Sequence, residues 1–210
     1  AYLAFNSPHY PIVPNKPYQG KSKAGYYGDF VIETDAMVGK VINALKKYGF
    51  AENTLVVFSA DNGPETHAFE RLEEFKQWSS GKYRGVKRDV YEGGHRVPFI
   101  VKWPGKTKQG SVSDEVVSQV DLAATFAKII GHRLRKNEAI DSYDLIPVLK
   151  GEKYDKPLRV ATVQNSDERA EKINLSEKSN DDSSQPIKSP YENLEPDLKQ
   201  SLVNGLILHY

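Results

Sequence analysis

Apolar positions follow two patterns along the chain, and the two patterns alternate. Between residues 26 and 48 they recur at helical spacing, and Gly49 is placed to end the helix. The main positions of this apolar stripe are Phe30, Thr34, Met37, Val41 and Leu45. Residues 54–58 instead form a continuous β-branched run, which is typical of a strand covered on both faces. We expect an α/β fold in which this strand is central and largely parallel to its neighbours, with the helical stripe packed on the sheet.

Short apolar segments predict the remaining elements. We expect a strand over residues 1–5, a short helix around 70–76, a strand over 97–103, a helix over 121–130, a short helix over 143–149 and a strand over 158–163. The chain starts with Ala1 rather than Met, inside a predicted strand. We therefore expect the sequence to be partial, so that a signal peptide is not observable in it.

The composition changes after about residue 164. Residues 167–188 are dominated by Ser, Asp, Glu, Lys and Asn and carry few apolar side chains. Such a segment has too little surface to bury to offset the entropy of ordering it. The sequence thus divides into a folded part, residues 1–164, and a polar tail, residues 165–210, which we expect to be disordered or atypical.

Charge and composition narrow the function classes. Lys and Arg number 29 and Asp and Glu 28, so a net charge of +1 gives no reason to expect a nucleic-acid or membrane-surface partner. No apolar run is long enough to predict a membrane span. The sequence contains no cysteine, which excludes disulfides, thiolate metal sites and a cysteine nucleophile within these residues.

Asp61-Asn62-Gly63 follows directly on the most apolar predicted strand. Ligand sites of open α/β sheets form beyond the carboxyl ends of the strands. Neighbouring carboxylate and amide oxygens are hard donors that suit Ca²⁺ or Mg²⁺. Asp-Asn-Gly is also ordinary turn chemistry, and on these residues alone the turn is the more frequent explanation.

Two further segments could bind an anion. Residues 82–88 hold a basic cluster that includes Arg84 and Lys87, although a solvated basic surface would look the same. Residues 91–98 place His95 and Arg96 behind two glycines that permit close backbone approach, or else form a sharp loop with a structural salt bridge. His9, just past the first predicted strand, can act as a general acid, but a lone histidine is more often structural.

Seven segments together carry a family resemblance: Phe5-Asn6-Ser7-Pro8-His9, Asp35 with Val38-Gly39, residues 53–63, Arg84-Gly85-Val86-Lys87, residues 92–100, Trp103-Pro104-Gly105 and Asp121-Leu122-Ala123-Ala124-Thr125. In this order and spacing the chain resembles the sulfatases of the alkaline-phosphatase superfamily over residues 1–159. The resemblance implies part of an alkaline-phosphatase-like sheet sandwiched by helices, incomplete on its N-terminal side. It also implies a periplasmic or extracellular location.

The resemblance assigns roles to individual residues. Asp61 and Asn62 resemble two ligands of the divalent cation, usually Ca²⁺, that binds the sulfate. Lys87 resembles the lysine that contacts a sulfate oxygen, and His9 resembles the histidine that stabilises or protonates the leaving oxygen. Such groups offset charge on the sulfuryl oxygens and supply a proton to an alkoxide. Arg84, His95 and Arg96 are expected to face the substrate in the same cleft.

The chain departs from the family in two catalytic features. Sulfatases carry a Cys or Ser in a Cys/Ser-x-Pro-x-Arg motif that becomes the formylglycine nucleophile, and no such motif occurs here. The paired aspartates that complete the metal site near a sulfatase N-terminus are also absent. We therefore expect the C-terminal part of a sulfatase catalytic domain, with formylglycine in the missing N-terminal part, and a chain that is inactive alone.

Three functions stay open at this point. The first is a sulfuric ester hydrolase seen in part, for which family analogy suggests a sulfated carbohydrate or other sulfated small molecule as substrate. The second is a phosphodiesterase or phosphonate hydrolase of the same superfamily, although the segments around Lys87 and His95 resemble sulfatases more closely. The third is a non-catalytic chain, either a pseudoenzyme or a degraded product.

Overall fold

The computed structural model describes residues 1–152, 155–163 and 206–208, and the expected polar tail lies almost wholly outside these residues. The helices are α1 (Gly25–Lys47), α2 (His67–Phe75), α3 (Glu92–His95), α4 (Asp121–Ile129) and α5 (Ile146–Lys150), with 3₁₀ turns η1 (Lys16–Tyr18) and η2 (Ala51–Asn53). The strands are β1 (Val56–Ser59), β2 (Phe99–Lys102), β3 (Val112–Ser113) and β4 (Leu206–Leu208). Most predicted elements therefore form, within a few residues of their expected limits.

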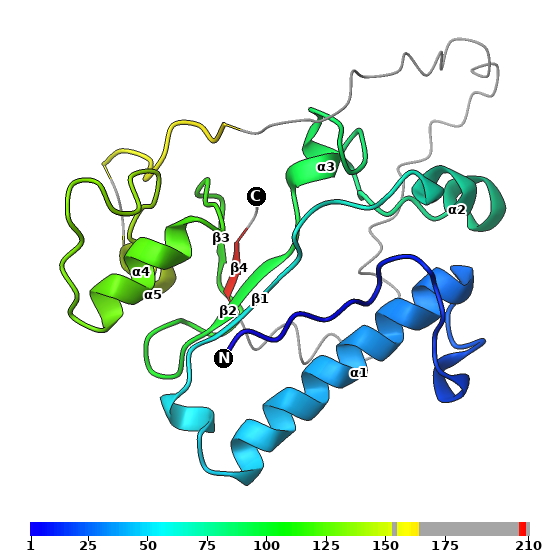
Figure 1. Ribbon diagram of the computed structural model, residues 1–210, viewed down its shortest axis with the longest axis horizontal. Helices are drawn as coiled ribbons and strands as arrows, with labels where there is room; N and C mark the ends of the chain where they lie inside the picture. The colour runs from blue at the N-terminus through cyan, green and yellow to red at the C-terminus, as the bar shows by residue number, and fades with distance from the viewer. Residues whose placement is uncertain (153–154, 164–205, 209–210) are drawn as a thin grey trace.

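The four strands make one sheet in the order β1-β2-β4-β3 (Figure 1). β1 and β2 pair antiparallel, with Val56 opposite Lys102 and Ser59 opposite Phe99. β4 runs antiparallel to β2 and parallel to β3. The prediction of a central, largely parallel β1 is therefore wrong. A β-branched apolar run indicates that both faces of a strand are covered, but it does not indicate the direction or the number of the neighbouring strands.

The hydrophobic core lies between the sheet and helices α4 and α5. Its buried members are Phe99, Val101, Val117, Leu145, Val148 and Leu149. Alternate residues of β2 point into this core, since Phe99 and Val101 are fully buried while Ile100 and Lys102 are half-buried. Leu55 and Val57 pack against the core from β1 and the residue before it. The core thus fixes the strand whose carboxyl end leads to Asp61.

The apolar stripe of helix α1 is less buried than predicted. Thr34 of the stripe is buried, but Met37 and Leu45 are only half-buried, and the elements that α1 chiefly contacts are η1 and η2. Its most buried side chains are instead acidic. Asp29 accepts hydrogen bonds from the backbone N–H groups of residues 20–22, and Glu33 accepts one from the N–H of Asn15. These carboxylates organise the preceding loop, which apolar periodicity could not reveal. The expected helix end is confirmed, because Gly49 has a positive φ of 77°.

Two predicted strands do not form. Residues 1–5 have no strand partner among the residues that the structure describes, and Tyr2 and Leu3 are 93% and 57% exposed. Residues 158–163 are also outside the sheet, with Val160 and Val163 almost fully exposed, while Leu158 packs against the core. A strand needs a neighbouring backbone to pair with, and that condition is not visible in a short apolar run.

No helix in the described part of the chain has the length and apolar composition needed to cross a bilayer.

A buried carboxylate at the start of α4 ties the C-terminal part of the fold together. Asp121 is fully buried and accepts hydrogen bonds from the N–H groups of Ser118 and Tyr143, at 2.7 and 2.9 Å. It also pairs with the guanidinium of Arg159, which lies over the ring of Tyr143. Thr125, one turn on, donates to the Asp121 carbonyl and accepts the N–H of Leu145. Asp121 therefore joins α4 to the segments before and after it.

We predict that Asp121→Asn lowers the free energy of unfolding by about 3 kcal/mol, because the substitution leaves the largely buried guanidinium of Arg159, which is 10% exposed, without a counter-charge. Urea denaturation of the chain measures the change. Asp114→Asn removes the same charge at an exposed position and is expected to change stability by less than about 0.5 kcal/mol. Equal effects of the two substitutions would contradict the assignment.

Candidate functional site

The site is built where two loops meet beyond the carboxyl end of β1. The first loop, residues 60–66, joins β1 to α2, and the second, residues 83–96, contains α3. Three backbone hydrogen bonds link them and close the second loop: Gly63 N–H to Gly94 O at 2.8 Å, Lys87 N–H to Pro64 O at 2.7 Å and Gly93 N–H to Arg84 O at 2.8 Å. These bonds place Asp61 and Asn62 close in the fold to Lys87.

Glycine is required at this junction because the two backbones are in direct contact. A Cβ on Gly63 would lie 1.9 Å from the carbonyl oxygen of Gly93. A Cβ on Gly93 would lie 2.1 Å from the carbonyl oxygen of Gly85, and one on Gly94 would lie 2.5 Å from that of Val86. Real Cβ atoms do not approach oxygen so closely. Gly63 therefore packs the first loop against the second, while Gly93 and Gly94 let the second loop fold back on itself.

The two predicted metal ligands lie at the start of the first loop. Asp61 is exposed, and the Asn62 side-chain amide donates from Nδ2 to the carbonyl oxygen of Gly63 at 2.8 Å. This bond uses the nitrogen of the amide and leaves Oδ1 as the atom available to a cation. The donor set fits part of a Ca²⁺ or Mg²⁺ site, which needs about six oxygen ligands. No group of three His, Cys, Asp or Glu residues within the described ranges has the arrangement of a metal site.

The Lys87 side chain is held by an acidic residue that the sequence analysis did not single out. Its Nζ lies 3.1 Å from Oε1 of Glu65, and Oε2 of the same carboxylate lies 2.9 Å from Nη1 of Arg88. Partial burial raises the pKa of the Glu65 carboxyl, but the hydrogen bonds and charges of Lys87 and Arg88 outweigh it and hold that pKa below its ordinary value. Glu65 is therefore ionised at neutral pH and pairs with both cations.

His9 is exposed, and its segment is linked to the site by the next residue, Tyr10. Its Nδ1 donates to the carbonyl oxygen of Tyr10 at 2.6 Å, which leaves Nε2 as the ring nitrogen available to a substrate. The ring of Tyr10 stacks on the ring of His67, with centroids 5.1 Å apart and an interplanar angle of 6°. His67 is the first residue of α2, so the segment that carries His9 lies against the end of the first loop.

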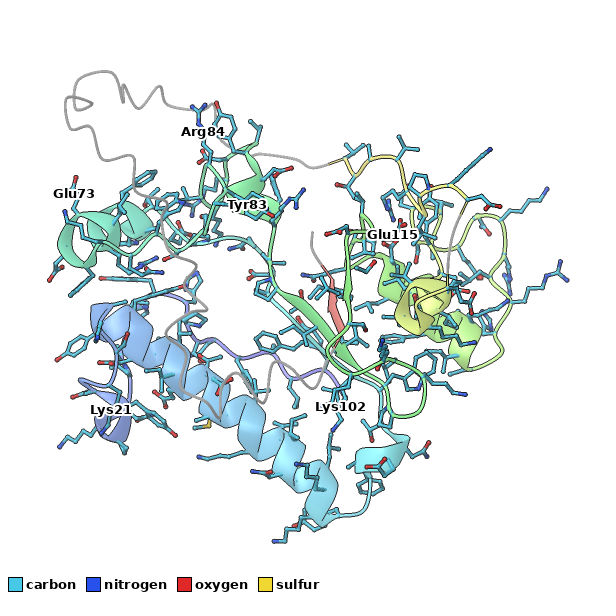
Figure 2. All side chains as sticks on the ribbon, turned by 180° about the vertical axis from the view of Figure 1, so that it is seen from behind. Lys21, Glu73, Tyr83, Arg84, Lys102 and Glu115 are labelled. Atoms are coloured by element: carbon cyan, nitrogen blue, oxygen red, sulfur yellow. The ribbon has the colours of Figure 1, made fainter. Side chains whose placement is uncertain are left out.

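The expected substrate-facing residues have structural partners of their own. Arg84 lies over the ring of Tyr91 at 3.9 Å, and Arg96 lies over the ring of Tyr83 and donates to its hydroxyl at 3.0 Å. Arg96 also pairs with Glu92, which confirms a salt bridge within residues 91–98. The buried Nε2 of His95 has no hydrogen-bond partner among the described residues. Figure 2 shows Tyr83 and Arg84 beside the short helix α3.

These contacts bring together the segments that carry His9, Asp61, Asn62 and Lys87. The link between the first loop and Lys87 is the bond from the Lys87 N–H to the carbonyl oxygen of Pro64, two residues after Asn62. The link to His9 runs through the stacked pair of Tyr10 and His67. Convergence of the four side chains on one substrate stays a prediction. Glu65 and His67 could not be chosen from the sequence, because their partners are defined only by the fold.

Solved structures identify the class of fold. A crystal structure of the protein Ps i-CgsB in complex with k-i-k-neocarrahexaose matches with a TM-score of 0.62 and 31% identity, over 72% of this chain and 33% of that one. Sulfatase structures match with TM-scores of 0.61 and 0.62. The described residues therefore form part of an alkaline-phosphatase-like α/β domain of the sulfatase type.

Sequence comparison gives the family. The family model for sulfatases matches residues 1–132, so the chain belongs to the sulfatase family. Steryl-sulfatase of Homo sapiens is 37% identical over 149 residues, which are 71% of this chain and 26% of that protein. N-acetylgalactosamine-6-O-sulfatase of Bacteroides thetaiotaomicron is 35% identical over 159 residues, which are 73% of this chain and 30% of that protein. The chain thus spans less than a third of the length of these relatives.

We predict that Gly93→Ala opens the second loop, disturbs its hydrogen bonds to the first loop and lowers the free energy of unfolding by about 1–3 kcal/mol, because the new methyl group overlaps the carbonyl oxygens of Gly85 and Arg84. Hydrogen exchange should show faster exchange of the Gly63 and Lys87 amides. The matched control is Gly39→Ala in α1, where a Cβ meets nothing within 4 Å. That substitution is expected to stabilise the helix by about 0.5–1 kcal/mol and to leave both amides unchanged. Unchanged exchange in Gly93→Ala would contradict the packing role.

Proposed function

We propose that this chain supplies part of the active site of a sulfuric ester hydrolase. The observation that carries the proposal is the contact between its two loops. Direct backbone hydrogen bonds hold the Asp61-Asn62 pair beside the segment of Lys87, in a chain whose relatives are sulfatases. Oxygen ligands for a cation and an ammonium group are the means by which a protein binds a sulfate ester and stabilises charge on its oxygens.

Each residue has one task in the proposed reaction. Lys87 contacts a nonbridging sulfuryl oxygen and stabilises the charge that grows there as the S–O bond breaks. His9 delivers a proton from Nε2 to the leaving alkoxide oxygen, since Nδ1 is engaged by the Tyr10 carbonyl. Asp61 and Asn62 Oδ1 would hold Ca²⁺, or Mg²⁺ in its place. When bound, the cation supplies additional positive charge at the sulfuryl oxygens.

The nucleophile is proposed to come from outside the 210 residues. The sequence has no cysteine and no Ser-x-Pro-x-Arg segment from which formylglycine is made. Without an activated nucleophile, the ammonium and imidazole groups have no covalent step to assist. We therefore propose that the chain alone does not turn over sulfate esters and that its activity requires the part of a sulfatase domain that carries the nucleophile.

A sulfated carbohydrate is the proposed substrate class. One relative is an N-acetylgalactosamine-6-O-sulfatase, and one structure of the same fold was solved in complex with k-i-k-neocarrahexaose. Steryl-sulfatase has a similar level of identity, so identity alone does not separate a sugar from a sterol. The paired arginines and tyrosines near α3 favour a polar substrate, because they present guanidinium and hydroxyl groups in place of an apolar surface.

We predict that the chain alone hydrolyses an aryl sulfate no faster than the uncatalysed rate in the presence of Ca²⁺. A longer polypeptide that includes coding sequence upstream of Ala1 should be active. In that polypeptide, His9→Ala is expected to lower kcat by about 10²- to 10⁴-fold and Lys87→Ala by about 10²- to 10³-fold. Steady-state turnover of 4-nitrophenyl sulfate measures the rate of Lys87→Ala, and turnover of a sulfated monosaccharide, whose alkoxide leaving group needs the proton, measures that of His9→Ala.

Matched controls separate the roles from effects on folding. His132→Ala and Lys128→Ala remove the same groups near the C-terminal end of α4, on the opposite side of the sheet from α2, and should leave turnover unchanged (Figure 1). Robust turnover by the chain alone would disprove the need for an external nucleophile. Full activity after Lys87→Ala would disprove the role of the ammonium group.

A further inference from the structure

Glu65 places a negative charge next to the cations of the candidate site. Its two carboxylate oxygens pair separately with Nζ of Lys87 at 3.1 Å and Nη1 of Arg88 at 2.9 Å. The side chains of Glu65 and Lys87 are 22% and 24% exposed, so the pair is partly shielded but still within reach of solvent. The three side chains together carry a net charge of +1, which still attracts an anion.

The fold fixes this carboxylate in position. The Pro64 carbonyl accepts the N–H of Lys87 at 2.7 Å, so the residue before Glu65 is bound to the residue that Glu65 pairs with. On its other side, the carbonyl oxygen of Glu65 accepts the N–H of Ala68, in the first turn of α2. Ala68 is fully buried. Glu65 is therefore anchored at both ends and does not depend on the ion pair alone for its place.

We propose that Glu65 is a specificity-determining residue that lowers the affinity of the Lys87 site for doubly charged anions more than its affinity for singly charged ones. The proposal rests on the proposed function, in which Lys87 contacts the sulfate group. A sulfate ester carries one negative charge. Its product, inorganic sulfate, carries two, and a phosphate monoester carries about 1.5 to 2 at pH 7.

The size of the effect follows from Coulomb's law. An anion on the free side of the Lys87 ammonium lies about 6 Å from the Glu65 carboxylate, which is two contact distances of about 3 Å. At the surface of a protein in physiological salt, repulsion at that distance lowers affinity by about three- to tenfold for each unit of charge on the anion. A dianion therefore loses about three- to tenfold more affinity than a monoanion.

This repulsion has two consequences for a hydrolase. The sulfate group carries one negative charge in the ester and two as the free product. Glu65 therefore weakens binding of the product relative to the substrate and favours product release. Phosphate monoesters are disfavoured for the same reason. The carboxylate meanwhile keeps the Lys87 side chain oriented in the free enzyme, because the two are in contact before any anion arrives.

The test measures anion binding and does not depend on catalysis. Methyl sulfate and inorganic sulfate are titrated at constant ionic strength into the ¹⁵N-labelled chain, and the amide shifts of Lys87 and its neighbours give the dissociation constants. Glu65→Gln is expected to tighten binding of both anions, by about three- to tenfold for methyl sulfate and by about three- to tenfold more than that for sulfate. Glu65→Asp keeps the charge and should retain the ratio of the two dissociation constants that the unsubstituted chain shows.

Glu152→Gln is the matched control, since it removes one negative charge from an exposed pair with Lys150 beyond α5. It should change both affinities equally and by less than about twofold. Equal tightening of the two anions in Glu65→Gln, or no tightening, overturns the inference while Lys87 keeps its role. Binding that survives Lys87→Gln overturns the proposed function as well, because the anion site is then elsewhere.

Discussion

The candidate site depends on one constraint, the backbone-to-backbone contact between the loop after β1 and the loop that contains α3. Gly63, Gly93 and Gly94 meet carbonyl oxygens at distances that no side chain permits. The contact is specific because N–H and C=O groups of the two loops pair across it. Without that contact, Asn62 and Lys87 would belong to two independent surface loops.

Electrostatics at the site follow from the same contact. Once the loops are joined, Glu65 falls within reach of both Lys87 and Arg88, and one carboxylate moderates a pair of cations. A site that binds anions through unopposed positive charge would also retain its own dianionic product. A nearby carboxylate lowers the affinity of the site for anions. In return it favours product release and discrimination against dianions, without contacting the substrate.

The rest of the fold positions β1, whose carboxyl end leads into the candidate site. β2 buries Phe99 and Val101 in the core that α4 and α5 cover, and β1 is held in register against β2. Asp121 with Arg159 closes that core from the C-terminal side. On the other side of β1, α1 is organised by buried carboxylates, Asp29 and Glu33, which collect N–H donors from the loop before the helix. The support of the site is thus apolar on one side and polar on the other.

The sequence by itself determined most of the helices, two of the strands and the family. Periodicity located α1, β1, β2 and α4, because side-chain burial repeats every 3.6 residues in a helix and runs continuously in a covered strand. The order of short motifs pointed to a sulfatase and to His9, Asp61, Asn62 and Lys87, because the order and spacing of motifs can be read directly from the sequence. Only the tertiary structure decided four other features. They are the direction of the strands, the burial of polar side chains on α1, the lack of a strand partner for residues 1–5 among the described residues, and the position of Glu65 beside Lys87. Each of these features depends on a partner distant in sequence, and a local sequence pattern gives no information about contacts between distant residues.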